Sequence, residues 1–175
     1  MTRPALHLRT LSPSNIGALA PALGEILIDC VEGGASVSFM RGLTPARAAG
    51  FWRSVSEKAS DGRAVIVAED AEGPLGVVQV IPAGVDNQPH RGDVSKMLVH
   101  RRSRRHGVGR LLMQAVETEA RRLGMTLLVL DTQEGSDAER LYARDGWTRA
   151  GTIPDYALTP DGALIATALY WKRIV

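Results

Sequence analysis

The sequence predicts a single α/β domain built on a mixed β-sheet, and two observations lead to that fold class. Short apolar runs of strand length alternate with longer segments in which apolar residues recur every three or four positions, as on the buried face of a helix. The chain has 175 residues, of which 45% are hydrophobic, enough for one core but not for two independent domains. We therefore expect residues 1–175 to form one domain.

Turn and capping residues place the boundaries between the elements. Ser12-Pro13 and Thr44-Pro45 each combine a helix-capping hydroxyl with a proline suited to the first helical turn. Residues 71–74 and 159–162 contain the glycine and proline expected at tight turns. The expected order is strand 5–10, helix 12–31, helix 44–60, strands 64–69, 75–81 and 93–99, helix 108–123, strand 127–132, helix 136–146, and strands 148–156 and 164–172.

For two of these elements, the strand at 127–132 and the helix at 136–146, the sequence predicts more than the type of element. The run from Leu127 to Leu130 is entirely apolar, which is typical of a strand covered on both faces. Ser136 followed by Glu139 is a capping-box pattern, in which each side chain bonds a backbone N–H at the helix start. Gly146 is expected to end that helix.

The composition excludes several kinds of protein. Cys30 is the only cysteine, so the chain can form neither an internal disulfide nor a cysteine-based metal site. His100 and His106 have no second ligand at metal spacing, and we expect no metal. We see no apolar run close to the roughly 20 residues that cross a bilayer, and no signal-peptide core. A cytoplasmic protein that does not associate with membranes is therefore expected.

Basic residues are concentrated in one short segment. The formal net charge is only +2, but five arginines fall between residues 101 and 110. Within that segment, Arg104 to Gly109 reads Arg-Arg-His-Gly-Val-Gly and lies between an apolar strand and an amphipathic helix. Glycines let the backbone approach a ligand closely, and the free N–H groups of a first helical turn attract anions. The segment predicts a phosphate-binding turn.

Two common phosphate motifs do not fit this turn. A Walker loop needs Lys and then Ser or Thr after its last glycine, where this chain has Arg110-Leu111. A dinucleotide fingerprint needs a third small residue, where this chain has Leu112. What remains is an arginine followed by Gly-x-Gly, separated from the preceding strand by four residues.

That pattern resembles the acetyl-CoA-binding motif of the GNAT superfamily of N-acyltransferases. The match runs from Met97-Leu98-Val99 through Arg104-x-x-Gly107-x-Gly109, and continues with Tyr142 and the pair Gly146-Trp147. The resemblance implies a mixed, mostly antiparallel sheet of six to seven strands, flanked by about four helices and splayed at a central parallel pair. It also implies acetyl-CoA as co-substrate.

A narrower resemblance is to the tabtoxin-resistance acetyltransferases. It rests on residues 34–40, on Leu130-Asp131-Thr132 with Gly135-Ser136, and on residues 159–162. It implies an amino-acid-like or antibiotic-like amine as acceptor, and a role in antibiotic or toxin resistance. We expect specificity to come from residues 34–40, 83–91 and 156–161.

Acetylation of an amine needs a group that takes a proton from the amine and a group that protonates the departing thiolate. Asp93 lies six residues before Val99, the spacing of the carboxylate base in similar histone-type enzymes. Those enzymes have Glu, and the shorter Asp favours a proton relay through water. Asp131, at the carboxyl end of its strand, is a candidate for substrate binding or auxiliary base, and burial there would raise its pKa. The resemblance assigns Tyr142 as general acid.

Each of these residues also has a purely structural interpretation, which the sequence leaves open. Asp93 and Asp131 could cap turns. Tyr142 could be a core residue, because Ala138 and Leu141 share its helix face.

For CoA, the resemblance implies that the backbone of the strand end pairs with pantetheine and that arginines at the rim face the phosphates. Ser136 stands where many members have an asparagine that contacts the pantetheine arm, although capping alone would explain it. Arg101 and Arg102 are expected to face solvent. The predicted CoA-binding residues are Met97, Leu98, Val99, Arg104, Arg105, His106, Gly107, Val108, Gly109, Arg110 and Ser136.

The sequence thus predicts an acetyl-CoA-dependent N-acetyltransferase that acetylates a small primary amine by direct transfer in a ternary complex. Acetylation of a protein or peptide amine, and a CoA-binding regulatory module without catalysis, are the alternatives. Nucleic-acid binding is disfavoured, because no aromatic residues are interleaved with the arginines. A homodimer is compatible with the resemblance.

Overall fold

A computed structural model describes residues 6–174, so Ala5 of the first expected strand lies outside the described part. The element order is the one expected from the sequence. β4 begins two residues earlier than expected, and α2 ends three residues earlier. The elements are β1 (His7–Thr10), α1 (Pro13–Glu32), α2 (Pro45–Glu57), β2 (Ala64–Asp70), β3 (Gly73–Pro82), β4 (Arg91–Val99), α3 (Val108–Arg122), β5 (Leu127–Gln133), α4 (Asp137–Arg144), β6 (Thr148–Leu158) and β7 (Leu164–Arg173).

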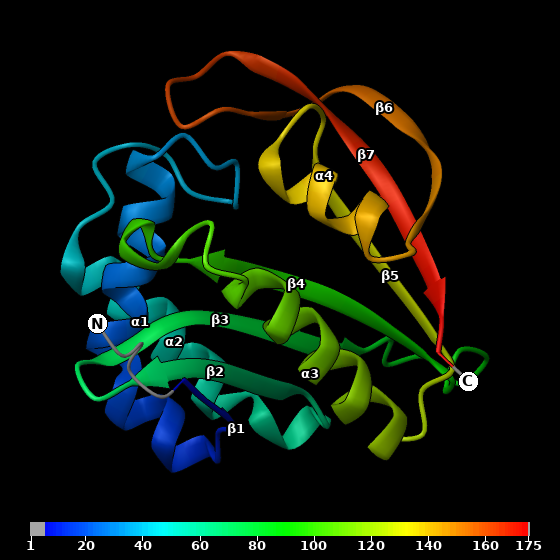
Figure 1. Cartoon of the computed structure of the whole chain (residues 1–175), viewed down its shortest axis with the longest axis horizontal. Coiled ribbons are helices and arrows are strands. Elements are labelled where there is room, and N and C mark those ends of the chain that lie inside the picture. Colours follow the sequence, from blue (N-terminus) through cyan, green and yellow to red (C-terminus); the bar gives the residue numbers. More distant parts are fainter. Residues whose placement is uncertain (1–5, 175) are drawn as a thin grey trace.

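Within residues 6–174, seven strands form one sheet in the order β1-β2-β3-β4-β5-β7-β6. Neighbouring strands are antiparallel except β4 and β5, which run parallel. That parallel pairing covers only Arg91–Leu127, Gly92–Leu128 and Asp93–Val129. Beyond these pairs the two strands diverge (Figure 1). The mixed sheet, splayed at a central parallel pair, is confirmed.

Gly92 lets the two halves of the sheet pack closely where the opening begins. A Cβ added to Gly92 would collide with Met125 Sδ and lie 2.9 Å from Val80 Cγ2. Because the core at this point is already filled, a larger residue would force neighbours apart. The gap between β4 and β5 therefore begins next to a tightly packed part of the core.

Helices cover both faces of the sheet. α3 packs on β2, β3 and β4, while α1 and α2 pack against each other on the opposite face (Figure 1). By length and composition α1 could cross a membrane, which corrects the expectation that no segment approaches that length. Half of the residues in its apolar window are buried, and α1 belongs to the cluster of buried residues that also contains α2.

β5 is not covered on both faces, contrary to the expectation for its apolar run. Leu128 and Leu130 are buried in the cluster beneath α3, whereas Leu127 and Val129 are only partly buried. The reason is the divergence of β4, which leaves Val129 lining a cavity. Sequence pattern alone could not distinguish a covered face from a cavity wall.

A β-bulge interrupts β4 beyond the parallel pairs. The register with β3 shifts between the pairs Gln79–Ser95 and Val77–Leu98. At the shift, Lys96 adopts a φ of +52°, which is uncommon for a residue other than glycine. A bulge adds a residue to one strand and redirects side chains.

The β6–β7 hairpin reaches across the opening to the loop between α1 and α2 (Figure 1). The Arg41 N–H donates to the Pro160 carbonyl at 3.0 Å, and the Arg41 guanidinium pairs with Asp161 at 2.5 Å. The Ser36 hydroxyl donates to the Leu158 carbonyl at 2.9 Å. The β6–β7 hairpin and the α1–α2 loop thus cover the gap between the splayed strands, and we call this cover the roof.

Candidate active site

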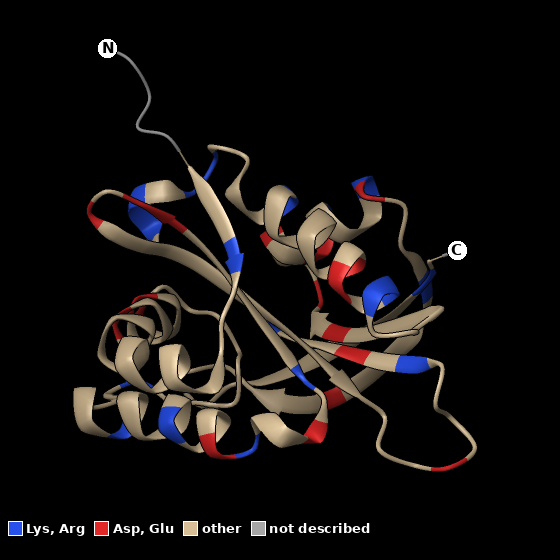
Figure 2. Cartoon of the chain, turned by 90° about the horizontal axis from the view of Figure 1, so that it is seen from below, with Lys and Arg blue, Asp and Glu red and all other residues tan. Residues whose placement is uncertain are grey.

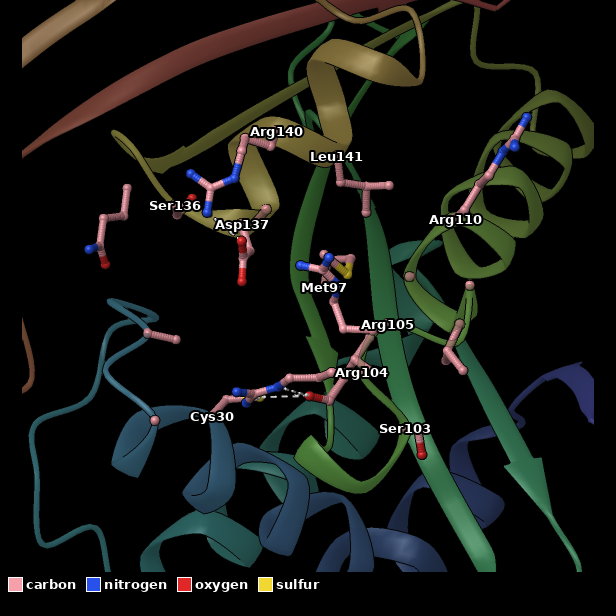
Figure 3. Close-up of a pocket in the computed structure, with 18 of the residues that line it drawn as sticks. Cys30, Met97, Ser103, Arg104, Arg105, Arg110, Ser136, Asp137, Arg140 and Leu141 are labelled. Atoms are coloured by element: carbon pink, nitrogen blue, oxygen red, sulfur yellow. Dashed lines mark hydrogen bonds and ion pairs between the residues drawn. The ribbon is translucent and has the colours of Figure 1, made fainter.

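Two cavities occupy the opening between β4 and β5. The first, which we call the turn cavity, measures about 600 Å³ and lies between the end of α1, the glycine turn and α4 (Figure 3). The second, the sheet cavity, measures about 720 Å³ and lies between β4, β5 and the β6–β7 hairpin. Both cavities are lined by Ala35, Met97, Gln133, Ser136 and Ala138. The two cavities therefore adjoin at Met97.

The N-terminus of α3 forms one wall of the turn cavity. The helices α1, α2 and α4 begin with side-chain caps from Ser12, Thr44 and Ser136. At the same position α3 has Gly107, with φ +83° and no side-chain cap. A Cβ added there would meet nothing within 4 Å. The unpaired N–H groups of the first turn are left for a ligand, and this arrangement favours phosphate.

The second glycine of the turn has a packing role. A Cβ on Gly109 would lie 3.1 Å from Leu141 Cδ2 and 3.8 Å from Met97 Sδ. Gly109 therefore allows α3 to lie close to α4 and β4. Gly109 also lines the turn cavity, as Gly107 does, so its packing role does not replace the predicted role in ligand binding.

Arg104 ties the glycine turn to the end of β4 and to α1. Its Nε donates to the Val99 carbonyl at 3.0 Å and its Nη2 to Asp29 Oδ2 at 3.3 Å, beside Cys30 (Figure 3). The Arg101 N–H also donates to Asp29 Oδ2, at 2.9 Å, and the Arg101 guanidinium pairs with the same carboxylate. Asp29 is only 9% exposed. Arg104 therefore holds the turn against α1, and Arg101 does not simply face solvent.

Other arginines remain at the rim of the turn cavity. Arg105 has a φ of +64°, a strained conformation that is characteristic of ligand-binding loops. Arg110 is 70% exposed and lies 3.9 Å from Asp145 Oδ1. Arg140 and Arg144 line the cavity from α4 and were not singled out from the sequence, because only the fold brings α4 to the turn.

Arg140 and Asp137 form an ion pair at the mouth of the turn cavity (Figure 3). Arg140 also donates to the Gly135 carbonyl at 2.9 Å. The Arg140 guanidinium holds the pKa of Asp137 below its usual range. Asp137 thus remains a carboxylate that orients Arg140.

Elsewhere on the molecule, charges of both signs are interspersed (Figure 2). The chain has 21 basic and 19 acidic residues, and surface arginines such as Arg102 pair with acidic neighbours, here Glu72 at 2.9 Å. A concentrated basic lining is found at the turn cavity, which fits a small anionic ligand better than a nucleic-acid backbone. Among the described residues, no group of histidine, cysteine and carboxylate side chains could hold a metal ion.

All three predicted catalytic residues line the sheet cavity. Asp93 occupies the last parallel pair of β4, and its Oδ1 accepts a hydrogen bond from Arg91 Nη1 at 2.9 Å. The side chain of Asp93 is 47% exposed, which leaves it open to water. Asp131 is exposed rather than buried, since β4 has moved away, and it accepts from the Thr167 hydroxyl at 3.3 Å.

Tyr142 is at once a core residue and a lining residue of the sheet cavity. Its ring packs against Trp147 and Tyr170, with centroids 6.0 and 6.3 Å away. Burial, and next the negative charge of Asp131, raise the pKa of Tyr142. The phenol is therefore protonated at neutral pH.

Ser136 caps α4 as expected, but the capping box is not reciprocal. The Ser136 hydroxyl accepts from the Glu139 N–H at 3.1 Å. The Glu139 carboxylate accepts from the Gly135 N–H at 2.6 Å and from the Tyr170 hydroxyl at 3.0 Å. At the other end, Gly146 has φ +80° and the helix closes with the Trp147 N–H on the Tyr142 carbonyl at 3.1 Å.

All but two of the residues predicted to bind CoA line the turn cavity. Leu98 is 2% exposed and is buried beneath α1 and α2. His106 is exposed and, in the described part of the chain, is not a lining residue. The prediction for Leu98 concerned its backbone, so a buried side chain is compatible with it.

Of the three segments expected to set specificity, two reach the sheet cavity. Ala35 to Ser38 line it from the α1–α2 loop, and Tyr156 lines it from β6. In the part of the chain described here, residues 83–91 line neither cavity.

In the sheet cavity, Lys96 is a charged lining residue that sequence reasoning missed. Its Nζ donates to the Ser38 hydroxyl at 3.2 Å and lies 5.8 Å from the centroid of the Phe51 ring. Burial lowers the pKa of Lys96, and the charge of Asp131 partly opposes that shift. The one signal in the sequence was a lysine within an apolar strand. The bulge that places it in the cavity could not be read from local pattern.

Solved acetyltransferases share this architecture. Ribosomal-protein-alanine N-acetyltransferase from Brucella melitensis has a TM-score of 0.79 at 22% identity, covering 95% of this chain and 99% of that one. A GCN5-related N-acetyltransferase from Kribbella flavida gives 0.78 at 24%, covering 97% and 98%. A phosphinothricin acetyltransferase from Sinorhizobium meliloti, in complex with acetyl-CoA, gives 0.79 at 17%, covering 97% and 88%. At these identities the likeness concerns the fold.

The family assignment comes from the sequence match. A family model described as the acetyltransferase (GNAT) domain matches residues 61–149, about half of the chain, from the start of β2 into β6. The chain belongs to the GNAT acetyltransferases. It is an N-acetyltransferase with acetyl-CoA as its co-substrate.

Proposed function

We propose that this enzyme transfers the acetyl group to the primary amine of a small amino-acid-like or antibiotic-like molecule, directly and within a ternary complex. The observation that carries the proposal is the junction of the two cavities beside Met97. CoA with its pyrophosphate at the start of α3 would bring its thioester to this junction. A volume of about 720 Å³ beneath the hairpin roof suits a small acceptor better than a long peptide.

In the proposed mechanism, Asp93 accepts the proton lost by the amine, through a water molecule. The free amine then attacks the thioester carbonyl, with Asp131 binding the acceptor or assisting as a second base. As the C–S bond breaks, Tyr142 hydrogen-bonds the departing sulfur and passes a proton to it, and the proton released by the new amide nitrogen restores the phenol through water. A backbone N–H at the end of β4 polarises the carbonyl, an effect typically worth about 3 kcal/mol of barrier.

The burial of Cys30 and the raised pKa of its thiol support direct transfer of the acetyl group rather than transfer through an acetylated cysteine. Cys30 is 4% exposed, and its thiol contacts the Val99 carbonyl at 3.6 Å. Burial raises the pKa of the Cys30 thiol, which disfavours the nucleophilic thiolate. Although Cys30 lines the turn cavity, it is a poor acetyl carrier.

A thiol-release assay with acetyl-CoA tests the proposal. The panel should contain free amino acids, dipeptides, polyamines and aminoglycosides, with mass spectrometry identifying the acetylated product. We expect amine-dependent thiol release with small amines. Acetylation confined to long peptides or proteins would contradict the small-molecule acceptor, and no release with any amine would contradict the proposal as a whole.

A further inference from the structure

Within residues 6–174, Lys96 is a half-buried cation that forms no ion pair, and the charge of Asp131 acts on it only from beyond 4.0 Å. Among residues 6–174, no carboxylate oxygen lies within 4.0 Å of its Nζ. An ammonium group has three donors, and the hydrogen bond to Ser38 uses one of them. Ser38 itself has a φ of +75°, the kind of strained backbone found at ligand-binding positions.

Keeping this ammonium in the cavity wall is unfavourable without a partner. Removing a charge from water is costly unless an opposite charge or hydrogen bonds compensate. The Phe51 ring offers partial compensation at 5.8 Å, and the pKa of Lys96 is lowered by burial. An anionic group on a bound ligand would supply the missing partner.

The other charges of the sheet cavity indicate what kind of ligand fits. In the described part of the chain, its charged lining residues are Asp93, Asp131 and Lys96. The two carboxylates complement an amine in its ammonium form, while Lys96 complements an anion. A ligand matched to all three is a zwitterion.

We propose that Lys96 binds an anionic group of the acceptor, so that the enzyme selects amines that also carry a carboxylate or another oxyanion. This inference rests on the proposed function, because it assigns the acceptor to the same cavity. It separates α-amino acids and amino-phosphonates, which carry such a group, from amides, polyamines and peptide N-termini, which lack one near the amine.

Kinetics with matched acceptors test this role. For the wild type, we expect kcat/KM for an amino acid to exceed that for its carboxamide by about tenfold to a hundredfold, the range for a charge-assisted hydrogen bond. Lys96→Met should lower kcat/KM for the acid and leave the amide nearly unchanged. An amino-phosphonate distinguishes a carboxylate site from a general oxyanion site. Lys58→Met, at an exposed lysine after α2, is the control and should change neither.

Two kinetic results would overturn the inference. One is a wild type without any preference for the acid over the amide. The other is a Lys96→Met variant in which both acceptors lose the same factor, since that would indicate a structural role.

A second measurement does not depend on turnover. Labelling of Lys96 by trace acetic anhydride, read by peptide mass spectrometry, should slow in the presence of the anionic acceptors and not with their amides. Unchanged labelling with every anionic acceptor would contradict the inference. Protection of Lys96 without thiol release from any amine would contradict the proposed function while supporting the anion site.

Discussion

A tyrosine that protonates a thiolate must keep its own proton until the sulfur departs. Tyr142 meets that condition because burial and the charge of Asp131 raise its pKa above the ordinary value of about 10. A raised pKa stabilises the neutral phenol to higher pH. Consequently, ionisation of Tyr142 should cause no fall in kcat below about pH 10.

Tyr142→Phe should lower kcat by about 10², because the leaving thiolate loses its proton donor. The KM for acetyl-CoA should change little, since the ring and its packing are kept. Tyr170→Phe is the matched control: its hydroxyl lines the same cavity but bonds Glu139, so kcat should be retained. Steady-state kinetics on both variants check this. A Tyr142→Phe enzyme with wild-type kcat would remove the acid assignment.

Asp93→Asn should lower kcat/KM at neutral pH, because the amine then lacks a proton acceptor. The deficit should shrink as the pH approaches the pKa of an alkyl amine, near 10, where free amine is abundant. A pH profile of kcat/KM measures this. A deficit that is constant with pH would assign Asp93 to positioning. Asp131→Asn provides the comparison, with a higher KM for the acceptor and an unaltered profile if Asp131 binds substrate.

Single residues also mark where sequence reasoning failed. Asp93 and Tyr142 could be named from motif spacing and Asp131 from its place at a strand end, and all three line one cavity. That Arg104 pairs with Asp29, 75 positions away, could not be predicted, because local sequence does not reveal long-range partners. The exposure of Asp131 was missed for a related reason: it depends on where β4 leaves β5.

At the element scale, the start of α3 differs from the starts of the other α-helices. Three of them begin with a side-chain cap, whereas α3, whose start lines the turn cavity, has none. Ser12, Thr44 and Ser136 were readable as caps from their own neighbourhoods, and each bonds its helix as expected. The uncapped start of α3 was equally readable from its glycines. The bulge in β4 was not, because it arises from the register between two strands.

Gly107→Ala should raise the KM for acetyl-CoA by about tenfold, since a Cβ would occupy the cavity wall where the pyrophosphate is expected. The positive φ of +83° should also cost about 1 kcal/mol in the free energy of unfolding. Gly124→Ala is the control. It has a φ of +82° and no neighbour within 4 Å, at the far end of α3, about 22 Å away.

Urea unfolding and acetyl-CoA kinetics on both variants separate the two effects. Both should lose similar stability, and only Gly107→Ala should lose affinity for acetyl-CoA. An unchanged KM in Gly107→Ala would place the pyrophosphate elsewhere.

At the scale of the whole molecule, the splay between β4 and β5 creates the site. The resemblance to the GNAT superfamily supplied this feature, and hydrophobic periodicity alone would have given only a mixed α/β sheet. The roof formed by the β6–β7 hairpin and the α1–α2 loop was not predicted, because it depends on contacts such as Arg41–Asp161, 120 residues apart. In the proposed function, that roof favours a small acceptor over a long peptide.

The central claim is that both substrates occupy the joined cavities at the same time. Initial rates measured over a matrix of acetyl-CoA and amine concentrations test it most directly. Simultaneous occupancy predicts reciprocal plots that intersect, with little thiol release when the amine is omitted. Parallel plots, together with a stoichiometric burst of thiol and an isolable acetyl-enzyme, would contradict it.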